Sequence, residues 1–158
     1  MSGTGQPTQG GVDATGMRIV VVAGAWHQTI SDALVAGAER MLEQANADYR
    51  VVRVAGAFEL PVVSKAALDH GADAVVALGV IIRGGTPHFE YISSSATDGL
   101  TRVAIDTGKP IGFGVLTLDD EQQGIERAGL AGSKEDKGFE AADAAVRAVT
   151  AIRGLRPR

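Results

Sequence analysis

Alternation between apolar runs and segments with helical periodicity is the feature of this sequence that most restricts its fold. Four runs rich in apolar residues predict strands that are covered on both faces, at residues 17–23, 49–54, 74–82 and 110–116. Apolar residues at helical spacing predict helices between and after them, at residues 30–45, 61–70, 87–106, 119–127 and 138–153. Because strands that alternate with helices form parallel sheets, we predict an α/β fold, a three-layer α/β/α sandwich around a four-stranded parallel sheet.

The first 16 residues lack this periodicity. They are rich in Gly, Thr and Gln, so we interpret residues 1–16 as a flexible N-terminal tail before a single domain at 17–158. An arm that pairs with a neighbouring subunit's sheet is the alternative. A length of 158 residues suits one domain with a sizeable core.

Composition excludes several classes of partner. A net charge of -4 argues against nucleic acid, whose binding proteins carry a basic face. No stretch approaches the roughly 18 apolar residues of a membrane span, and the N-terminus does not resemble a secretory signal. The chain has no cysteine, which excludes disulfides and Cys-based zinc sites and fits a reducing compartment. We therefore expect a cytoplasmic protein with no nucleic-acid or membrane partner.

The stretch ALGVIIRGGTPHFEYI at residues 77–92 predicts a ligand-binding turn, because a buried strand passes through glycines into a helix. Gly84 and Gly85 would let the backbone approach a ligand closely. The helix N-terminus would add N–H groups and a positive dipole end, which suits an anion such as phosphate. A plain tight turn with Thr86 as helix cap is the alternative. Neither a P-loop nor the GxGxxG fingerprint of dinucleotide-binding proteins is present.

His88 would lie in the first turn of that helix. The dipole there favours a neutral imidazole, which could accept or donate a proton near pH 7. A surface histidine without a role is the alternative. The spacing from His88 to Glu90 is not the i, i+4 pair of a helical zinc site, so we expect no metal.

The turns after the first three strands should meet at the carboxyl edge of the sheet. Trp26 could stack on a heterocycle there or anchor a helix. Phe58 and Phe113 have the same two interpretations, and the residues alone favour packing in the core. Glu59 could cap the next helix or accept hydrogen bonds from a ligand.

Two basic residues lie late in the chain, Arg127 and Lys137. A solvated surface position is the ordinary interpretation of both. Arginine is nevertheless the better partner for phosphate, because its planar guanidinium can bind two oxygens.

Four motifs together resemble the lumazine synthase family, in the family's order and spacing. They are AGAFELP at 55–61, ALGVIIRGGTPHFEYI at 77–92, PIGFGVLT at 110–117, and ERAG with EDKG at 126–129 and 135–138. The resemblance covers about residues 17–155. It implies a flavodoxin-like sheet, no metal or redox cofactor, and a homo-oligomer, a pentamer in which neighbouring subunits share each site. The implied reaction condenses 5-amino-6-(D-ribitylamino)uracil with 3,4-dihydroxy-2-butanone 4-phosphate, both small-molecule substrates, to 6,7-dimethyl-8-ribityllumazine.

The resemblance also implies roles for individual residues. Trp26 would stack on the aminouracil. Its ribityl chain and part of its ring would be held by Ala57, Phe58 and Glu59, and backbone groups would be presented to it by Val80, Ile81 and Ile82. Phosphate binding is implied for Gly85, Thr86 and the neighbouring subunit's Arg127. His88 would carry protons, and the neighbour's Phe113 and Lys137 would close the site. Some family members have a polar side chain at the position of Gly85, so the contact here would use the backbone. Others have Asn at the position of Phe113.

Two other functions remain open at this point. A related riboflavin synthase would convert lumazine alone and ignore the phosphate ester, and the predicted phosphate turn argues against it. A flavin- or lumazine-binding module, or a shell-forming protein, would bind without turnover. The sequence does not distinguish a pentamer from stacked pentamers or a sixty-subunit shell.

Overall fold

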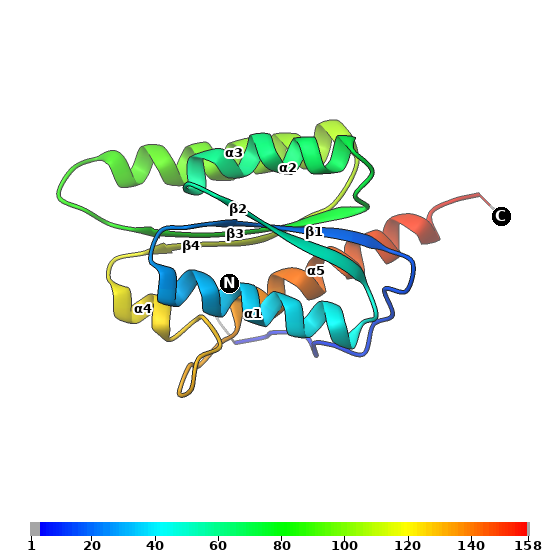
Figure 1. Ribbon diagram of the computed structural model, residues 1–158, viewed down its shortest axis with the longest axis horizontal. Helices are drawn as coiled ribbons and strands as arrows, with labels where there is room; N and C mark the ends of the chain where they lie inside the picture. The colour runs from blue at the N-terminus through cyan, green and yellow to red at the C-terminus, as the bar shows by residue number, and fades with distance from the viewer. Residues whose placement is uncertain (1–3, 158) are drawn as a thin grey trace.

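A four-stranded parallel sheet forms the centre of the protein, in a computed structural model that describes residues 4–157 (Figure 1). The strand order is β2-β1-β3-β4. The strands are β1 (Arg18–Gly24), β2 (Asp48–Val54), β3 (Ala74–Ile82) and β4 (Ile111–Leu118). The predicted flavodoxin-like three-layer α/β/α sandwich is confirmed.

Helices cover both faces of the sheet (Figure 1). One face carries α1 (Gln28–Gln44) and α5 (Lys137–Gly154), and the other carries α2 (Leu60–Asp69) and α3 (His88–Thr107). A 3-10 turn, η1 (Ala57–Glu59), precedes α2, and a short α4 (Glu121–Ile125) follows β4. This arrangement requires strands that are apolar on both faces, as the continuous apolar runs predict.

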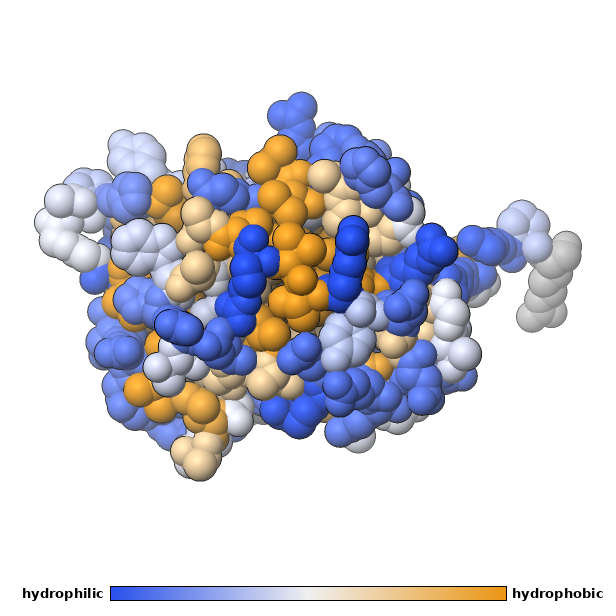
Figure 2. Space-filling view, in the orientation of Figure 1, coloured by the Kyte–Doolittle hydropathy of each residue, from blue (hydrophilic) through white to orange (hydrophobic). Residues whose placement is uncertain are grey.

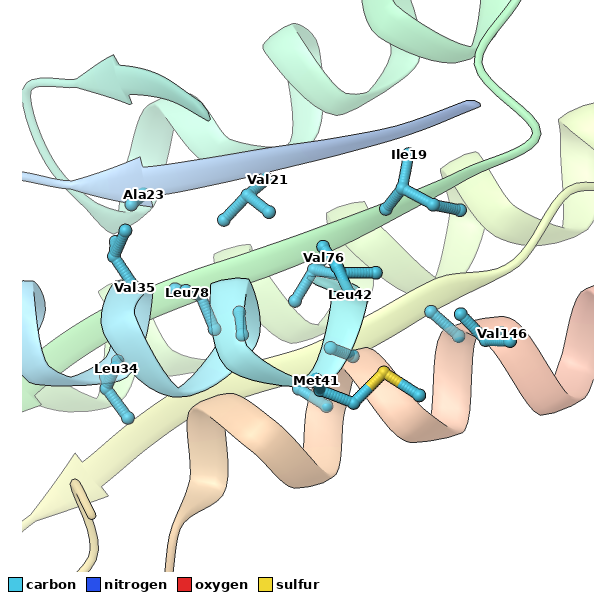
Figure 3. Packing of buried hydrophobic residues seen from close by; sticks show 14 of the residues in the cluster. Ile19, Val21, Ala23, Leu34, Val35, Met41, Leu42, Val76, Leu78 and Val146 are labelled. Carbon is cyan, nitrogen blue, oxygen red and sulfur yellow. The ribbon is translucent and has the colours of Figure 1, made fainter. Parts of the chain in front are cut away.

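The core has two halves because successive residues of a strand point to opposite faces of the sheet. Val21 of β1 lies in the cluster beneath α1 and α5, whereas Val22 lies in the cluster beneath α2 and α3. Figure 3 shows the first cluster, in which Leu34, Val76 and Val146 come from α1, β3 and α5. Both clusters hold the strands rigidly, so the turns that leave the sheet start from fixed positions.

Most element boundaries lie within one or two residues of their predicted positions, and β3 has its predicted bounds. The strand β4 continues to Leu118, two residues beyond the predicted end. Its pairing with β3 continues through Ile82 and Leu118. Local hydropathy does not predict this extension, because the extra residues are held by backbone pairing with β3.

The segment before β1 has defined contacts in its second half. The Gly10 N–H donates to Asp143 Oδ1 at 3.0 Å, and Arg147 Nη2 donates to the Gly10 carbonyl at 2.9 Å. Ala14 is fully buried, and its N–H donates to the Ala45 carbonyl at 2.7 Å. Gly10 and Ala14 of the predicted tail therefore contact α5 and the end of α1. The composition of this segment did not predict these contacts, because backbone groups make most of them.

Flexibility of residues 4–7 and the division into a tail and one domain stay predictions. Residues 1–3 of the expected tail lie outside the described residues. Within residues 4–157, no helix is both long and apolar enough to cross a membrane.

The two outer strands, β2 and β4, leave the sheet with open edges. Figure 2 shows that hydrophobic surface gathers in the middle of the face across which β2 runs, among hydrophilic side chains. Beyond β4, exposed apolar residues include Ile105 of α3 and Ile152 of α5. Open edges beside apolar surface are suited to contacts with other chains.

Candidate active site

A cavity of about 560 Å³ lies at the carboxyl ends of β1, β2 and β3. Residues from all three turns that follow these strands line it, as predicted. Its lining comprises Trp26, His27, Ala55, Gly56, Ala57, Phe58, Glu59, Ile81, Ile82, Gly84, Thr86, His88, Phe89 and Ile92.

Strand order and register explain why the cavity forms here. The chain passes from β1 outward to β2 and then crosses back to β3, so the crevice between β1 and β3 is a topological switch point. The β1–β3 pairing ends at Ala23 and Leu78, whereas the β3–β4 pairing continues to Ile82 and Leu118. The last residues of β3 therefore extend beyond β1 into the cavity.

The three predicted residues of this strand end differ in position. Ile81 and Ile82 line the cavity. The side chain of Val80 packs in the core beneath α1 and α5, and the residue is 7% exposed. Only the backbone of Val80 could therefore take part in binding.

Two aromatic side chains are unusually exposed at the cavity. Trp26 is 67% exposed and Phe58 is 62% exposed. Packing in the core, which the residues alone favoured for Phe58, is therefore wrong. Aromatic faces held open at the end of a sheet are suited to stacking on a planar ligand.

The glycine turn brings Gly84, Thr86 and His88 to the same cavity. Gly85 lies between them in the chain but is not part of the lining that the described residues form. The helix α3 begins at His88, with Pro87 as its cap residue. The Thr86 hydroxyl lies 3.4 Å from the His88 nitrogen, so any hydrogen bond there is long.

Neither glycine of this turn is required by the protein's own packing. A Cβ added to Gly84 or Gly85 would have no neighbour within 4 Å among the described residues. Neither residue is among those with positive φ. The space beside both glycines is therefore open, and it would let a ligand approach the backbone closely.

The Arg83 side chain is held by contacts with three other residues, and Arg83 is not part of the cavity lining that the described residues form. Its guanidinium pairs with Glu90, donates to Asp119 Oδ1 at 3.1 Å, and lies 4.2 Å from the centre of the Phe89 ring. The hydrogen bond from Arg83 lowers the pKa of the Glu90 carboxyl. Arg83 thus links β3, α3 and the segment after β4, and holds the turn in place.

Glu59 acts within the chain as a cap. Its Oε2 accepts a hydrogen bond from the Gly56 N–H at 2.9 Å, which closes the turn before η1. The carboxylate nevertheless remains on the cavity wall. The side chain thus caps η1, whereas it makes no capping hydrogen bond to α2, and contact with a ligand stays a prediction.

The remaining predicted residues line a second cavity of about 400 Å³ along β4. Phe113, Arg127 and Lys137 lie there with Glu135. The Lys137 N–H donates to the Arg127 carbonyl at 2.9 Å, and this backbone link holds the two basic residues together. Phe113 is 48% exposed, so the core position favoured for it is also wrong.

Carboxylates surround the two cations of the second cavity. Lys137 Nζ lies 2.6 Å from Glu140 Oε2 and 3.4 Å from Glu135 Oε2. Arg127 Nε lies 3.8 Å from the same Glu135 oxygen, and Arg127 Nη1 donates to the Gln123 carbonyl at 2.8 Å. These contacts orient both side chains.

His27 and Gly56 lie in turns that were expected to meet here, but the sequence assigned neither of them a binding role. His27 has left-handed backbone angles, with φ 55° and ψ 66°, where α1 begins. Such a conformation is uncommon for a residue other than glycine. The sequence signal for a role of His27 was its position directly after Trp26. Among the described residues, no group of three or more His, Asp or Glu is arranged to hold a metal ion.

Fold and site together define a doubly wound α/β protein with a cavity at its topological switch point. A family model described as 6,7-dimethyl-8-ribityllumazine synthase matches residues 16–153. The chain belongs to the 6,7-dimethyl-8-ribityllumazine synthase family.

Relatives in several bacteria carry the same family name. The 6,7-dimethyl-8-ribityllumazine synthase of Leifsonia xyli subsp. xyli is 68% identical, over 99% of each chain. That of Clavibacter michiganensis subsp. michiganensis is 63% identical, again over 99% of each. That of Kineococcus radiotolerans is 56% identical over 99% of this chain and 98% of its own.

Proposed function

We propose that the protein is an enzyme that makes 6,7-dimethyl-8-ribityllumazine from 5-amino-6-(D-ribitylamino)uracil and 3,4-dihydroxy-2-butanone 4-phosphate. The amine and the ketone form an imine and release one water. Elimination then releases phosphate, and ring closure releases a second water. Family membership supports this reaction over riboflavin synthesis or binding without turnover.

The observation that carries the proposal is the composition of the first cavity. It combines exposed aromatic faces, a glycine turn whose glycines the chain's own packing does not require, and a histidine. These are the parts needed to hold a planar heterocycle beside a phosphate ester and to move protons between them.

In this proposal the aminouracil lies against Trp26, with Phe58 and Glu59 beside its ribityl chain. The residues at 57–59 and 80–82 offer backbone groups to it. Because β3 extends beyond β1, its backbone at 80–82 has room for such contacts. Stacking and backbone hydrogen bonds together would fix the ring's orientation.

The phosphate ester would lie at Gly85 and Thr86, near the N-terminus of α3. Backbone N–H groups and the positive end of the helix dipole stabilise the leaving phosphate. His88 follows in the first turn of α3 and would transfer protons among amine, imine and enol. Holding both substrates in one cavity supplies further acceleration, because the reaction becomes effectively unimolecular.

We further propose that a neighbouring copy completes each site, in a homo-oligomer such as a pentamer. Phe113, Arg127 and Lys137 line a cavity separate from that of His88, and β4 beside them has an open edge. A neighbour that brings this edge to the first cavity would add Arg127 to the phosphate. Native mass measurement tests the assembly, and a stable monomer with full activity would contradict it. The cytoplasmic location stays a prediction.

Turnover with both substrates tests the reaction. Purified protein is mixed with the aminouracil and the butanone phosphate, and the lumazine is followed by its absorbance and fluorescence. We expect formation well above the spontaneous rate, with one phosphate released per lumazine. No acceleration would overturn the proposal. Consumption of lumazine alone would favour riboflavin synthesis instead.

A further inference from the structure

We propose that Gly56 is a positioning residue for Trp26, because the missing side chain at Gly56 determines where the indole meets the aminouracil. This inference rests on the proposed function in one respect, the identity of the ring that stacks on Trp26. The placement of the indole against Gly56 does not depend on it.

Distances around Gly56 show how closely the indole approaches. A Cβ added to Gly56 would lie 3.1 Å from Trp26 Cδ1 and 3.2 Å from Trp26 Nε1. Ordinary van der Waals contacts of a Cβ begin at about 3.4 Å. The edge of the indole's five-membered ring therefore lies against the backbone of Gly56, in space that any side chain would take.

Backbone conformation does not explain the glycine. Gly56 has φ -160° and ψ -168°, an extended conformation that any residue adopts. The nearest atom outside Trp26 is Glu59 Oε2, which would lie 3.6 Å from an added Cβ, and this is an ordinary contact. The tight approach therefore comes from the indole, and the indole is the physical reason for glycine at this position.

Gly56 provides a fixed surface because its own position is well determined. Its N–H donates to Glu59 Oε2 at 2.9 Å, and its carbonyl accepts from the Glu59 N–H at 3.3 Å. A Cβ on Gly24, at the end of β1, would lie 3.4 Å from the Gly56 carbonyl carbon. The turn after β2 is thus packed directly against the turn after β1.

The indole, in contrast, has little else to confine it. Trp26 is 67% exposed, and its ring centre lies 6.4 Å from that of His27 at a tilt of 46°. A methyl group at Gly56 would move the indole rather than the turn. A shift of a few tenths of an ångström would then misplace the stacking face without touching His88 or the glycine turn at 84–86.

A mutant cycle tests this role. We expect Gly56→Ala to raise the KM for the aminouracil about three- to tenfold, with kcat within about twofold. Trp26→Phe removes the five-membered ring, so Gly56→Ala should have a much smaller effect in that background. Gly154→Ala is the matched control, because an added Cβ there would meet no described atom within 4 Å. It should change neither constant.

Fluorescence gives a readout that is independent of turnover, because Trp26 is the only tryptophan. Gly56→Ala should shift or quench the emission of the free protein, and Gly154→Ala should not. If Gly56→Ala leaves both the emission and the KM unchanged, the proposal is overturned. An equal rise in KM when Gly56→Ala is added to the Trp26→Phe background would also overturn the proposal, because Gly56 would then act through the turn alone.

Two further outcomes are informative. If the wild type makes no lumazine, the proposed function fails, and the emission comparison still decides whether the indole rests on Gly56. If Gly56→Ala does not fold, the double variant with Trp26→Phe decides. Recovery of folded protein would identify the indole as the obstacle, and failure to recover would overturn the proposal.

Discussion

His88 is the residue that best separates proton transfer from the holding of substrates. It is exposed on the cavity wall at the start of α3, so the core does not depend on it. His88→Ala should lower kcat about 10- to 100-fold, because proton transfer is lost while the cavity still holds both substrates. Stopped-flow measurement of lumazine formation would give the rate, and thermal unfolding should be nearly unchanged.

A second histidine provides the control for that substitution. His70 is also exposed, at the end of α2, where its Nδ1 lies 2.6 Å from the Ala66 carbonyl oxygen. His70→Ala should leave kcat unchanged, because His70 does not line the cavity formed by the described residues. Equal rates for His88→Ala and the wild type would remove His88 from the proposed mechanism.

At the scale of elements, close packing of α5 on α1 positions the second cavity. A Cβ added to Gly138 would lie 1.9 Å from the Leu34 carbonyl oxygen. Gly138→Ala should therefore lower the free energy of unfolding by about 1–3 kcal/mol, despite the better helix propensity of alanine. Urea unfolding would measure the change. Gly154→Ala, at the other end of α5, should stay within about 0.5 kcal/mol of the wild type.

Tyr49 connects β2 to α1, because its hydroxyl donates to Glu43 Oε1 at 2.8 Å. Burial, followed by this hydrogen bond, raises the pKa of Tyr49 from 10.0 to about 12. The unfolded chain therefore loses this proton before the folded protein does. The contribution of Tyr49 is fully present below about pH 10 and is lost as the pH rises towards about 12.

Substitution of Tyr49 isolates that contribution. Between about pH 9 and about pH 11, Tyr49→Phe should lose less of its free energy of unfolding than the wild type does, because it lacks the titrating phenol. Urea unfolding at both values, in parallel for the two proteins, would measure the difference. Parallel losses in the two proteins would contradict the linkage.

At the scale of the whole molecule, the proposed site is divided between two copies. His88→Ala and Arg127→Ala would each damage a different half of it. When the two variants are co-expressed, about a quarter of the boundaries in a mixed ring should combine two intact halves. Activity should therefore exceed that of either variant alone, measured as lumazine formed per subunit.

A second pair of co-expressed variants tests whether the recovered activity comes from sites that two subunits share. His88→Ala and Thr86→Ala both damage the half that one chain supplies, because Thr86 and His88 line the same cavity. Their co-expression should give no recovery. Recovery in both mixtures, or in neither, would contradict a site divided between His88 and Arg127.

Local patterns in the sequence were sufficient to predict most of the fold. The apolar run at 74–82 identified β3 with its bounds, because a strand buried on both faces needs apolar side chains at every position. Alternation of strands and helices then implied the parallel sandwich. The segment around Ala14 escaped prediction, since its contacts are backbone hydrogen bonds that composition does not reveal.

The candidate site could be predicted only in part. The turns at 26, 56–59 and 84–88 were expected to meet, and they line one cavity. The exposure of Phe58 and Phe113 was not expected, because an isolated phenylalanine in a sequence is more often found in a core. The contact of Gly56 with Trp26 was not predicted, because nothing in the sequence shows that an indole from another turn lies against this glycine.

The sequence by itself determined the order of strands and helices, the parallel sheet and the chemical groups at the strand ends. Hydrophobic periodicity and turn chemistry are local properties that a chain carries before it folds. Only the tertiary structure decided that Trp26 rests on Gly56, that Val80 faces the core, and that Arg127 and His88 line different cavities. These relations depend on register and on distances between segments far apart in the chain, which the packing of the helices on the sheet sets.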